Sequence, residues 1–115
     1  VLSRIAAFVV VSALAWPTHV PAAAAQTPRR IISLVPAVTE MLFAMGAGPA
    51  VVAVSSFDRF PPEAASLPKV GALIDPDFER VLSLRPDLVV IYGSQSDLAT
   101  RLSRASIPYI STKRS

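Results

Sequence analysis

Short apolar runs alternate with amphipathic stretches along most of the chain. The runs Ile31–Val35, Val51–Val54 and Asp87–Tyr92 are short and rich in branched apolar residues, which is typical of strands that are buried on both faces. The stretches after the first and third runs, beginning at Pro36 and Ser96, repeat apolar residues at helical spacing. This pattern predicts strands and helices in alternation.

Start and stop residues set the expected helix boundaries. Pro36 suits the first position of a helix, and Gly46 supplies the stop of the same helix. Asp75 is expected to cap a second helix, which Arg85–Pro86 ends. A third helix is expected over Ser96–Ala105.

Two weaker segments are also predicted to be strands, a very short one at Lys69–Gly71 and a last one at Ile107–Ser111. Before the first of these, Pro61 and Pro62 indicate a fixed loop. Apolar strands that alternate with helices form parallel sheets with right-handed crossovers and helices on both faces. The chain is therefore expected to be an α/β protein, a Rossmann-like three-layer α/β/α lobe around a mostly parallel sheet of about four to five strands.

The N-terminal segment has a different pattern. Arg4 precedes the apolar run Ile5–Trp16, and the small-residue stretch Pro21–Ala25 follows that run. A basic start, an apolar centre and an Ala-x-Ala end are typical of a secretory signal peptide, and the run is shorter than the roughly 20 residues that cross a bilayer. Residues 1–25 are therefore expected to be a cleaved signal peptide, which leaves residues 26–115 in the periplasm. The alternative is an N-terminal core helix.

Composition removes several classes of function. The 115 residues contain no Cys, and the one His, His19, lies in the expected signal peptide. Disulfide scaffolds, thiol nucleophiles, lipid-attached cysteines, most transition-metal sites and Ser–His pairs are thereby excluded, so no metal, no cofactor and no enzymatic reaction is expected. The net charge of +3 comes from isolated basic pairs, so nucleic acid is not expected as a partner.

Three segments are expected to meet at one rim of the sheet. Ligands of such sheets bind beyond the carboxyl ends of the strands, where Val35–Ala37, Ser55–Arg59 and Tyr92–Gln95 follow the predicted strands. Phe57 and Tyr92 are aromatic residues at these ends, and their rings can stack on a flat or apolar ligand. From the residues alone, the favoured interpretation is that each of these rings, like that of Phe60, fills the core or the rim.

The carboxylates of Asp75, Asp77 and Glu79 lie close together in the sequence. A hard-cation site is one interpretation, but no oxygen-rich sequence around them completes a calcium loop. Negative side chains at a helix N-terminus are stabilised by the helix dipole. Helix capping is therefore the favoured interpretation.

Three successive blocks of the sequence resemble a known family. They read RIISLVPAVTEMLFAMGAG, VVAVSSFDRFPPEAASLPKVG and DPDFERVLSLRPDLVVIYG. Their order and spacing are similar to the N-terminal lobe of the periplasmic substrate-binding proteins for vitamin B12 and iron chelates. The resemblance implies two Rossmann-like lobes joined by one long helix, a ligand held between them and delivery of that ligand to an ABC permease. This chain is expected to be a partial sequence that carries one lobe, with the linking helix and the second lobe absent.

The resemblance also implies roles for individual residues. Phe57 stands where cobalamin binders place an aromatic side chain against the corrin ring, and Tyr92 stands where they place a second one. Pro36 and Ala37 match the first strand-to-helix rim, and Arg59 belongs to the same rim segment as Phe57. These residues are the predicted ligand-binding residues.

Two further positions concern the partner and the ligand. Glu79 matches a carboxylate that, in the family, meets an arginine of the permease, and Ala72 stands where haem-binding relatives typically carry an iron-ligating tyrosine. The expected function is an exported, monomeric solute-binding lobe that holds cobalamin or an iron chelate by stacking and shape and passes it to an inner-membrane permease. The alternatives are a haem- or siderophore-binding protein of the same fold, a Rossmann-type enzyme and a non-functional truncated product.

Overall fold

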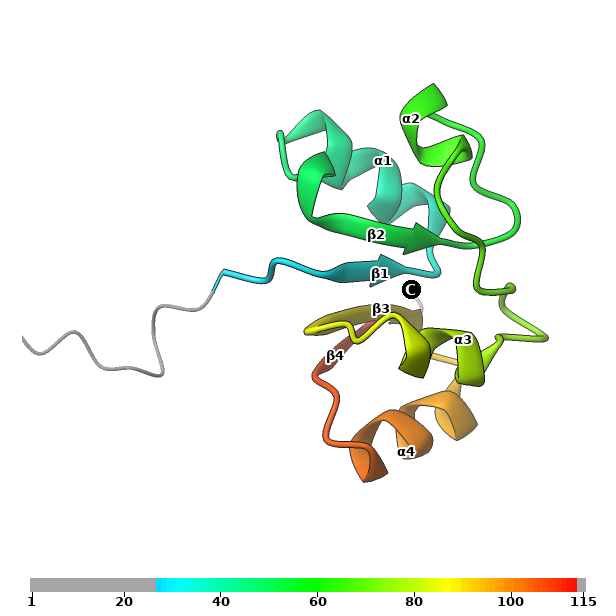
Figure 1. The fold of residues 1–115 in the computed structure, drawn as a ribbon. Helices are drawn as coiled ribbons and strands as arrows, with labels where there is room; N and C mark the ends of the chain where they lie inside the picture. The colour runs from blue at the N-terminus through cyan, green and yellow to red at the C-terminus, as the bar shows by residue number, and fades with distance from the viewer. Residues whose placement is uncertain (1–26, 114–115) are drawn as a thin grey trace, which may run out of the picture.

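The strands form one parallel sheet in the computed structural model, which describes residues 27–113 (Figure 1). They lie in the order β2-β1-β3-β4, and every neighbouring pair is parallel. Their bounds are β1 Ile31–Ser33, β2 Val51–Val54, β3 Leu88–Tyr92 and β4 Tyr109–Thr112. The expected α/β architecture with a parallel sheet is thereby confirmed. The expected signal peptide lies outside the described residues.

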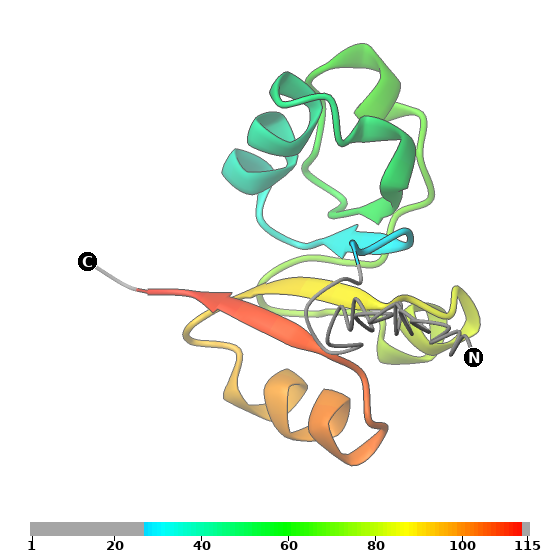
Figure 2. The same cartoon turned by 90° about the vertical axis from the view of Figure 1, so that its left-hand side faces the viewer.

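Helices connect the strands, and in both views α4 lies beside β4 while α1 and α2 lie at the β2 end of the sheet (Figures 1 and 2). Their bounds are α1 Pro36–Ala44, the 3-10 turn η2 Gly48–Ala50, α2 Pro62–Ala65, α3 Phe78–Ser83 and α4 Ser96–Arg104. No helix within residues 27–113 combines the length and the apolar character needed to span a bilayer.

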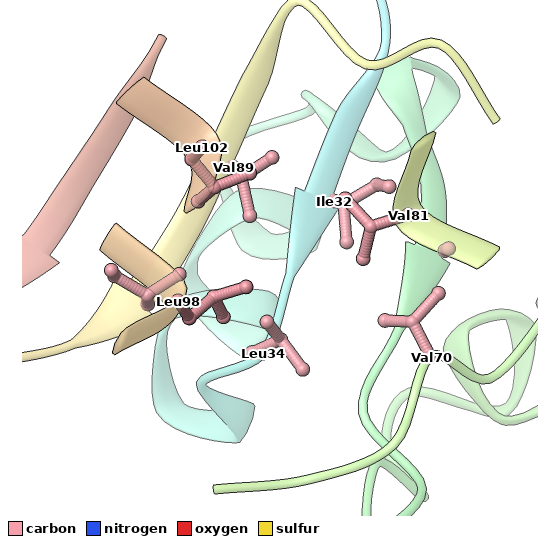
Figure 3. Packing of buried hydrophobic residues seen from close by; sticks show 9 residues of the cluster. Ile32, Leu34, Val70, Val81, Val89, Leu98 and Leu102 are labelled. Carbon is pink, nitrogen blue, oxygen red and sulfur yellow. The ribbon is translucent and has the colours of Figure 1, made fainter. Parts of the chain in front are cut away.

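Successive side chains of the central strands point to opposite faces of the sheet. On one face, Ile32 and Leu34 pack with residues of α3 and α4, as Figure 3 shows. On the other face, Ile31 and Val35 pack with the apolar side of α1. The buried cluster of the first face consists of Ile32, Leu34, Ala53, Val70, Val81, Val89, Ile91, Leu98 and Leu102. Helices therefore cover both faces, and the three-layer prediction is confirmed.

The first helix ends where its glycine predicts. Gly46 follows α1 with a φ of 84°, a left-handed conformation that glycine adopts without steric cost. The N–H of Ala47 donates to the carbonyl of Leu42 at 2.8 Å. This bond closes a Schellman turn and satisfies a carbonyl at the end of the helix.

The last strand begins later than predicted because the preceding helix ends in a similar turn. Ser106 has a φ of 57°, and the N–H of Ile107 donates to the carbonyl of Leu102 at 2.9 Å. Ile107 therefore belongs to the turn that ends α4, and the strand starts at Tyr109. No glycine marks this turn in the sequence.

The expected cap of the second helix is wrong by two residues. Asp77, and not Asp75, is the N-cap of α3, and its Oδ1 atom accepts the N–H of Arg80 at 3.1 Å. The N–H of Asp77 donates to the carbonyl of Val70 at 2.8 Å. This bond and the bridge between Gly71 and Pro76 keep the chain out of the helix up to Asp77, so the helix begins at Phe78.

Two expectations for the connection between β2 and α3 also differ from the structure. Lys69–Gly71 forms isolated bridges, with Val54 and with Pro76, instead of a strand. The expected proline loop contains a short helix, α2, which starts at Pro62 and buries Ala64 completely. Proline is favoured at the first position of a helix, and the buried alanine ties this turn to the sheet.

Candidate ligand-binding site

The strand order places a cavity at one end of the sheet. The chain passes from β1 to β2 on one side and then returns to β3 on the other, so the order reverses between β1 and β3. Doubly wound sheets bind ligands at this point, beyond the carboxyl ends of the strands. A cavity of about 500 Å³ opens here, lined by Leu34, Pro36, Ser55, Phe57, Ala72, Leu73, Ile74, Asp75 and Tyr92.

The structure brings together some of the predicted ligand-binding residues. Pro36 at the start of α1, Phe57 in the loop after β2 and Tyr92 at the end of β3 line the same cavity. Ala37 and Arg59 are exposed and are not among its lining residues. The shared rim is therefore present, while the ligand contacts of all five residues stay a prediction.

Phe57 is held out toward solvent by a buried turn. The backbone N–H and the hydroxyl of Ser55 donate to Oδ2 of Asp58 at 2.8 and 2.7 Å. The N–H of Phe57 donates to Oγ of Ser55 at 3.2 Å, and Nζ of Lys69 donates to the carbonyl of Asp58 at 3.0 Å. Asp58 is buried, whereas the Phe57 ring is 69% exposed. The aromatic side chain thus stands on a fixed support without being part of the core.

Tyr92 belongs both to the core and to the cavity. It is the last residue of β3 and is partly buried against the cluster that faces α1. Its position in the cavity lining leaves the ring available for stacking and the hydroxyl for a hydrogen bond. The hydroxyl of Ser55 in the same lining already donates to Asp58.

The residues 71–76 form a tight turn that supplies another wall of the cavity. Gly71 starts the turn with a φ of 86°, and an antiparallel bridge closes it. A Cβ atom at Gly71 would collide with the carbonyl oxygen of Asp75, so the turn requires glycine at this position. Leu73 and Ile74 form the tip, 43% and 94% exposed, and both line the cavity.

Sequence reasoning did not assign the 71–76 turn to the site. A signal was present, because Leu73 and Ile74 stand between a glycine and an Asp–Pro pair, which are turn-forming residues. Apolar side chains at a loop tip are exposed unless something covers them. Ala72, where the resemblance places a tyrosine in haem binders, also lies in the cavity lining.

A second cavity lies on the other side of this turn. It has a volume of about 360 Å³ and shares Leu73, Ile74 and Asp75 with the first cavity. Its other lining residues are more polar: Pro76, Phe78, Ser94, Gln95, Ser96, Asp97, Leu98 and Arg101. The guanidinium of Arg101 lies 5.6 Å from the centroid of the Phe78 ring, within the range of a cation–π interaction. The 71–76 turn is therefore a partition between an apolar and a polar cavity.

The first cavity offers shape and apolar surface. Its lining is mostly apolar and includes one acidic residue, Asp75. Within residues 27–113, no group of three or more His, Cys, Asp or Glu side chains is arranged to hold a metal ion. The geometry is suited to holding a molecule by stacking and burial of apolar surface.

Comparison with known proteins identifies the family. A family model described as a periplasmic binding protein matches residues 31–112. The chain therefore belongs to the periplasmic binding protein family.

Individual relatives agree with this assignment. A vitamin B12-binding protein of Pectobacterium carotovorum is 39% identical over 90 residues, which cover 76% of this chain and 33% of that protein. The crystal structure of the periplasmic vitamin B12 binding protein of Vibrio cholerae matches with a TM-score of 0.68 and 32% identity, over 75% of this chain and 34% of that one. A periplasmic haem-binding protein from Roseiflexus sp. RS-1 matches with a TM-score of 0.65 and 34% identity, over 72% of this chain and 33% of that one. The chain thus spans about a third of the length of these relatives.

Proposed function

We propose that this chain is part of an exported substrate-binding protein that holds a cobalamin or an iron chelate in the cavity at the carboxyl ends of β1, β2 and β3 and delivers it to an ABC permease. The observation that carries the proposal is the exposure of Phe57, Leu73 and Ile74 around that cavity. Apolar side chains exposed to water cost free energy, which a ligand with a flat apolar surface recovers by covering them. The protein performs no chemistry on the ligand.

Cobalamin is the first candidate ligand. The vitamin B12-binding relatives support it, together with the aromatic side chains of Phe57 and Tyr92 at the cavity. A corrin ring held by stacking and shape needs no metal ligand from the protein, and the described part of the chain contains neither His nor Cys. One lobe covers one side of such a ligand, so we expect weaker binding than in relatives about three times as long.

Haem is the second candidate because of one residue and one relative. Tyr92 places a phenol in the cavity lining, and tyrosine is one of the side chains that ligate haem iron. The haem-binding relative from Roseiflexus sp. RS-1 supports the same candidate. One residue argues against haem, because the cavity lining has Ala72 where haem-binding relatives typically carry an iron-ligating tyrosine.

Titration of the 115-residue chain with cyanocobalamin and with haemin, followed by absorption spectroscopy, tests the function. Ile74→Ser is expected to weaken binding by about tenfold because Ile74 lines the cavity. Ile110→Ser is the matched control, since Ile110 is also an exposed isoleucine, 54% accessible, but lies on β4. Binding of neither compound at concentrations up to their solubility, or equal effects of the two substitutions, would contradict the proposal.

We also propose that Glu79 docks the protein on its permease. Glu79 is exposed in the first turn of α3 and does not line the cavity. A carboxylate at this place can meet a cationic side chain of a partner. Glu79→Ala is expected to weaken uptake of the ligand by cells and Glu79→Arg to abolish it, both with unchanged ligand binding. Glu63→Arg, in the first turn of α2, is the control, and unchanged uptake with Glu79→Arg would exclude the docking role.

A further inference from the structure

Gln95 connects two walls of the cavity through its side-chain amide. It is 6% exposed although it is polar. Its Oε1 atom accepts the backbone N–H of Tyr92 at 2.8 Å, and its Nε2 atom donates to the carbonyl of Leu73 at 3.1 Å. One buried side chain therefore joins the carboxyl end of β3 to the tip of the 71–76 turn.

The backbone of Gln95 is itself fixed, so the direction of this side chain is defined. Its N–H donates to the carbonyl of Tyr92 at 3.0 Å, and its carbonyl accepts the N–H of Ala99 at 3.0 Å, which makes it the N-cap residue of α4. The amide uses its oxygen as an acceptor and one of its two N–H groups as a donor. An ionised glutamate has no donor for the Leu73 carbonyl, and methionine replaces neither bond.

We propose that Gln95 is a positioning residue of the ligand site, which holds the 71–76 turn at a set distance from Tyr92. The inference rests on the proposed function and adds to it the residue that sets the shape of the cavity. Leu73, Ile74 and Asp75 line both cavities, so a turn released from Gln95 changes the width of the apolar cavity and opens it to the polar one. Gln95 thereby determines which ligand shapes fit, without touching the ligand.

Hydrogen exchange without ligand tests the connection. In Gln95→Met, the amide of Tyr92 is expected to exchange at least about tenfold faster because its acceptor is lost. The amide of Val89 at the other end of β3, which donates to the carbonyl of Pro108 at 3.0 Å, is expected to change much less. Thr100→Ala is the matched control on α4, since the exposed Thr100 hydroxyl bonds only to the carbonyl of Ser96 within the helix.

Gln95→Glu is a second variant, in which protonation of the new carboxyl restores the lost donor. A protonated glutamate still offers an acceptor and a donor, whereas an ionised one offers only acceptors. Ionisation therefore removes only the bond to the Leu73 carbonyl, and the Tyr92 amide keeps its acceptor at every pH. The amide of Ser56, which donates to the carbonyl of Gly71 in the turn at 2.8 Å, is expected to be protected as in the wild type at acid pH and less protected after the new carboxyl ionises. Asp75 of the turn and Asp97 and Arg101 of α4 line the cavity beside this group, so each pH is compared with the wild-type chain at the same pH.

Ligand selectivity distinguishes a positioning role from a merely structural one. A general loss of stability lowers the affinities for cyanocobalamin and haemin by the same factor, whereas a changed cavity shape alters their ratio. We expect the ratio of the cyanocobalamin affinity to the haemin affinity to move about tenfold closer to unity in Gln95→Met. The same ratio is expected to stay unchanged in Thr100→Ala. Unchanged exchange of the Tyr92 amide, or an unchanged affinity ratio, overturns the role of Gln95. If the wild-type chain binds neither compound, the proposed function fails, while the exchange data still decide whether Gln95 holds the turn.

Discussion

The two ends of the sheet are built differently. At the amino end, the carboxylate of Asp87 accepts the N–H groups of Arg29 and Arg30 at 2.8 and 2.9 Å. The guanidinium of Arg30 donates to the carbonyls of Leu84 at 2.6 Å and of Arg85 at 3.2 Å. Polar groups there are paired with one another and close the end of the fold. At the carboxyl end, apolar side chains surround an open cavity.

This difference separates residues that hold the fold together from residues that are available for a ligand. The bonds at the amino end join the starts of β1 and β3 and stabilise the chain by itself. The exposed side chains of Phe57 and Ile74 at the carboxyl end stabilise nothing in the isolated chain and gain free energy only when something covers them. Changes at the amino end should therefore alter stability, and truncation of the exposed side chains at the carboxyl end should alter binding.

The largest effect is expected where the carboxyl end depends on backbone geometry. Gly71→Ala should lower the free energy of unfolding by about 2 to 5 kcal/mol, because a left-handed alanine is strained and its Cβ atom would collide with the carbonyl of Asp75. Gly46→Ala is the matched control, since Gly46 has a similar φ of 84° but no atom within 4 Å of the added Cβ, and should cost about 1 to 2 kcal/mol. Urea denaturation measures both, and equal costs would contradict the close approach at Gly71.

Truncation of the aromatic residues tests whether the carboxyl end serves binding. Phe57→Ala is expected to weaken cyanocobalamin or haemin binding by about 1 to 3 kcal/mol and to change stability by less than about 1 kcal/mol. Tyr92→Ala should weaken binding similarly but also lower stability, because Tyr92 packs against the core as well. Calorimetric titrations and thermal melts give the two quantities. A large loss of stability in Phe57→Ala with intact affinity would make Phe57 a core residue.

The amino end should show the opposite response. Asp87→Ala removes the acceptor of two backbone N–H groups and is expected to lower the free energy of unfolding by about 1 to 2 kcal/mol, with ligand affinity unchanged. Asp87→Asn, which keeps one acceptor oxygen, should cost less. Urea denaturation and ligand titration of the same samples check the prediction, and a selective loss of affinity would break the distinction between the two ends.

The smallest effect is a pH dependence at the amino end. The N–H of Arg29, followed by that of Arg30, lowers the pKa of Asp87 below its ordinary value. Because the folded-state pKa is the lower one, this contribution to stability is complete above the pKa of the unfolded chain and is lost as the pH falls through the folded-state pKa. Asp87 is exposed, so solvent screening keeps the effect below about 1 kcal/mol. Unfolding curves of Asp87→Asn should show a weaker acid dependence than the wild type, and identical curves would exclude this contribution.

Much of the fold could be predicted from the sequence because its signals are local. Val51–Val54 is a strand, and Ile31–Val35 begins with one, because branched apolar residues follow one another in both segments. The helix α1 lies between Pro36 and Gly46 because proline favours the start of a helix and glycine favours its end. The rim that joins Pro36, Phe57 and Tyr92 followed from a general property of parallel sheets.

The remainder of the site depends on contacts between distant segments. The helix cap lies at Asp77 and not at Asp75 because the N–H of Asp77 is bonded to the carbonyl of Val70. The side-chain bond between Gln95 and Leu73 joins residues 22 positions apart. No periodicity or composition marks such a pair, since each hydrogen bond requires both partners to be brought together by the folded sheet. By itself, the sequence determined the order, the type and the parallel arrangement of the four strands and of α1, α3 and α4, through the burial of apolar side chains. Only the tertiary structure decided which loop residues form the cavity wall and which side chain holds them in place, because those contacts exist only after the sheet has brought the loops together.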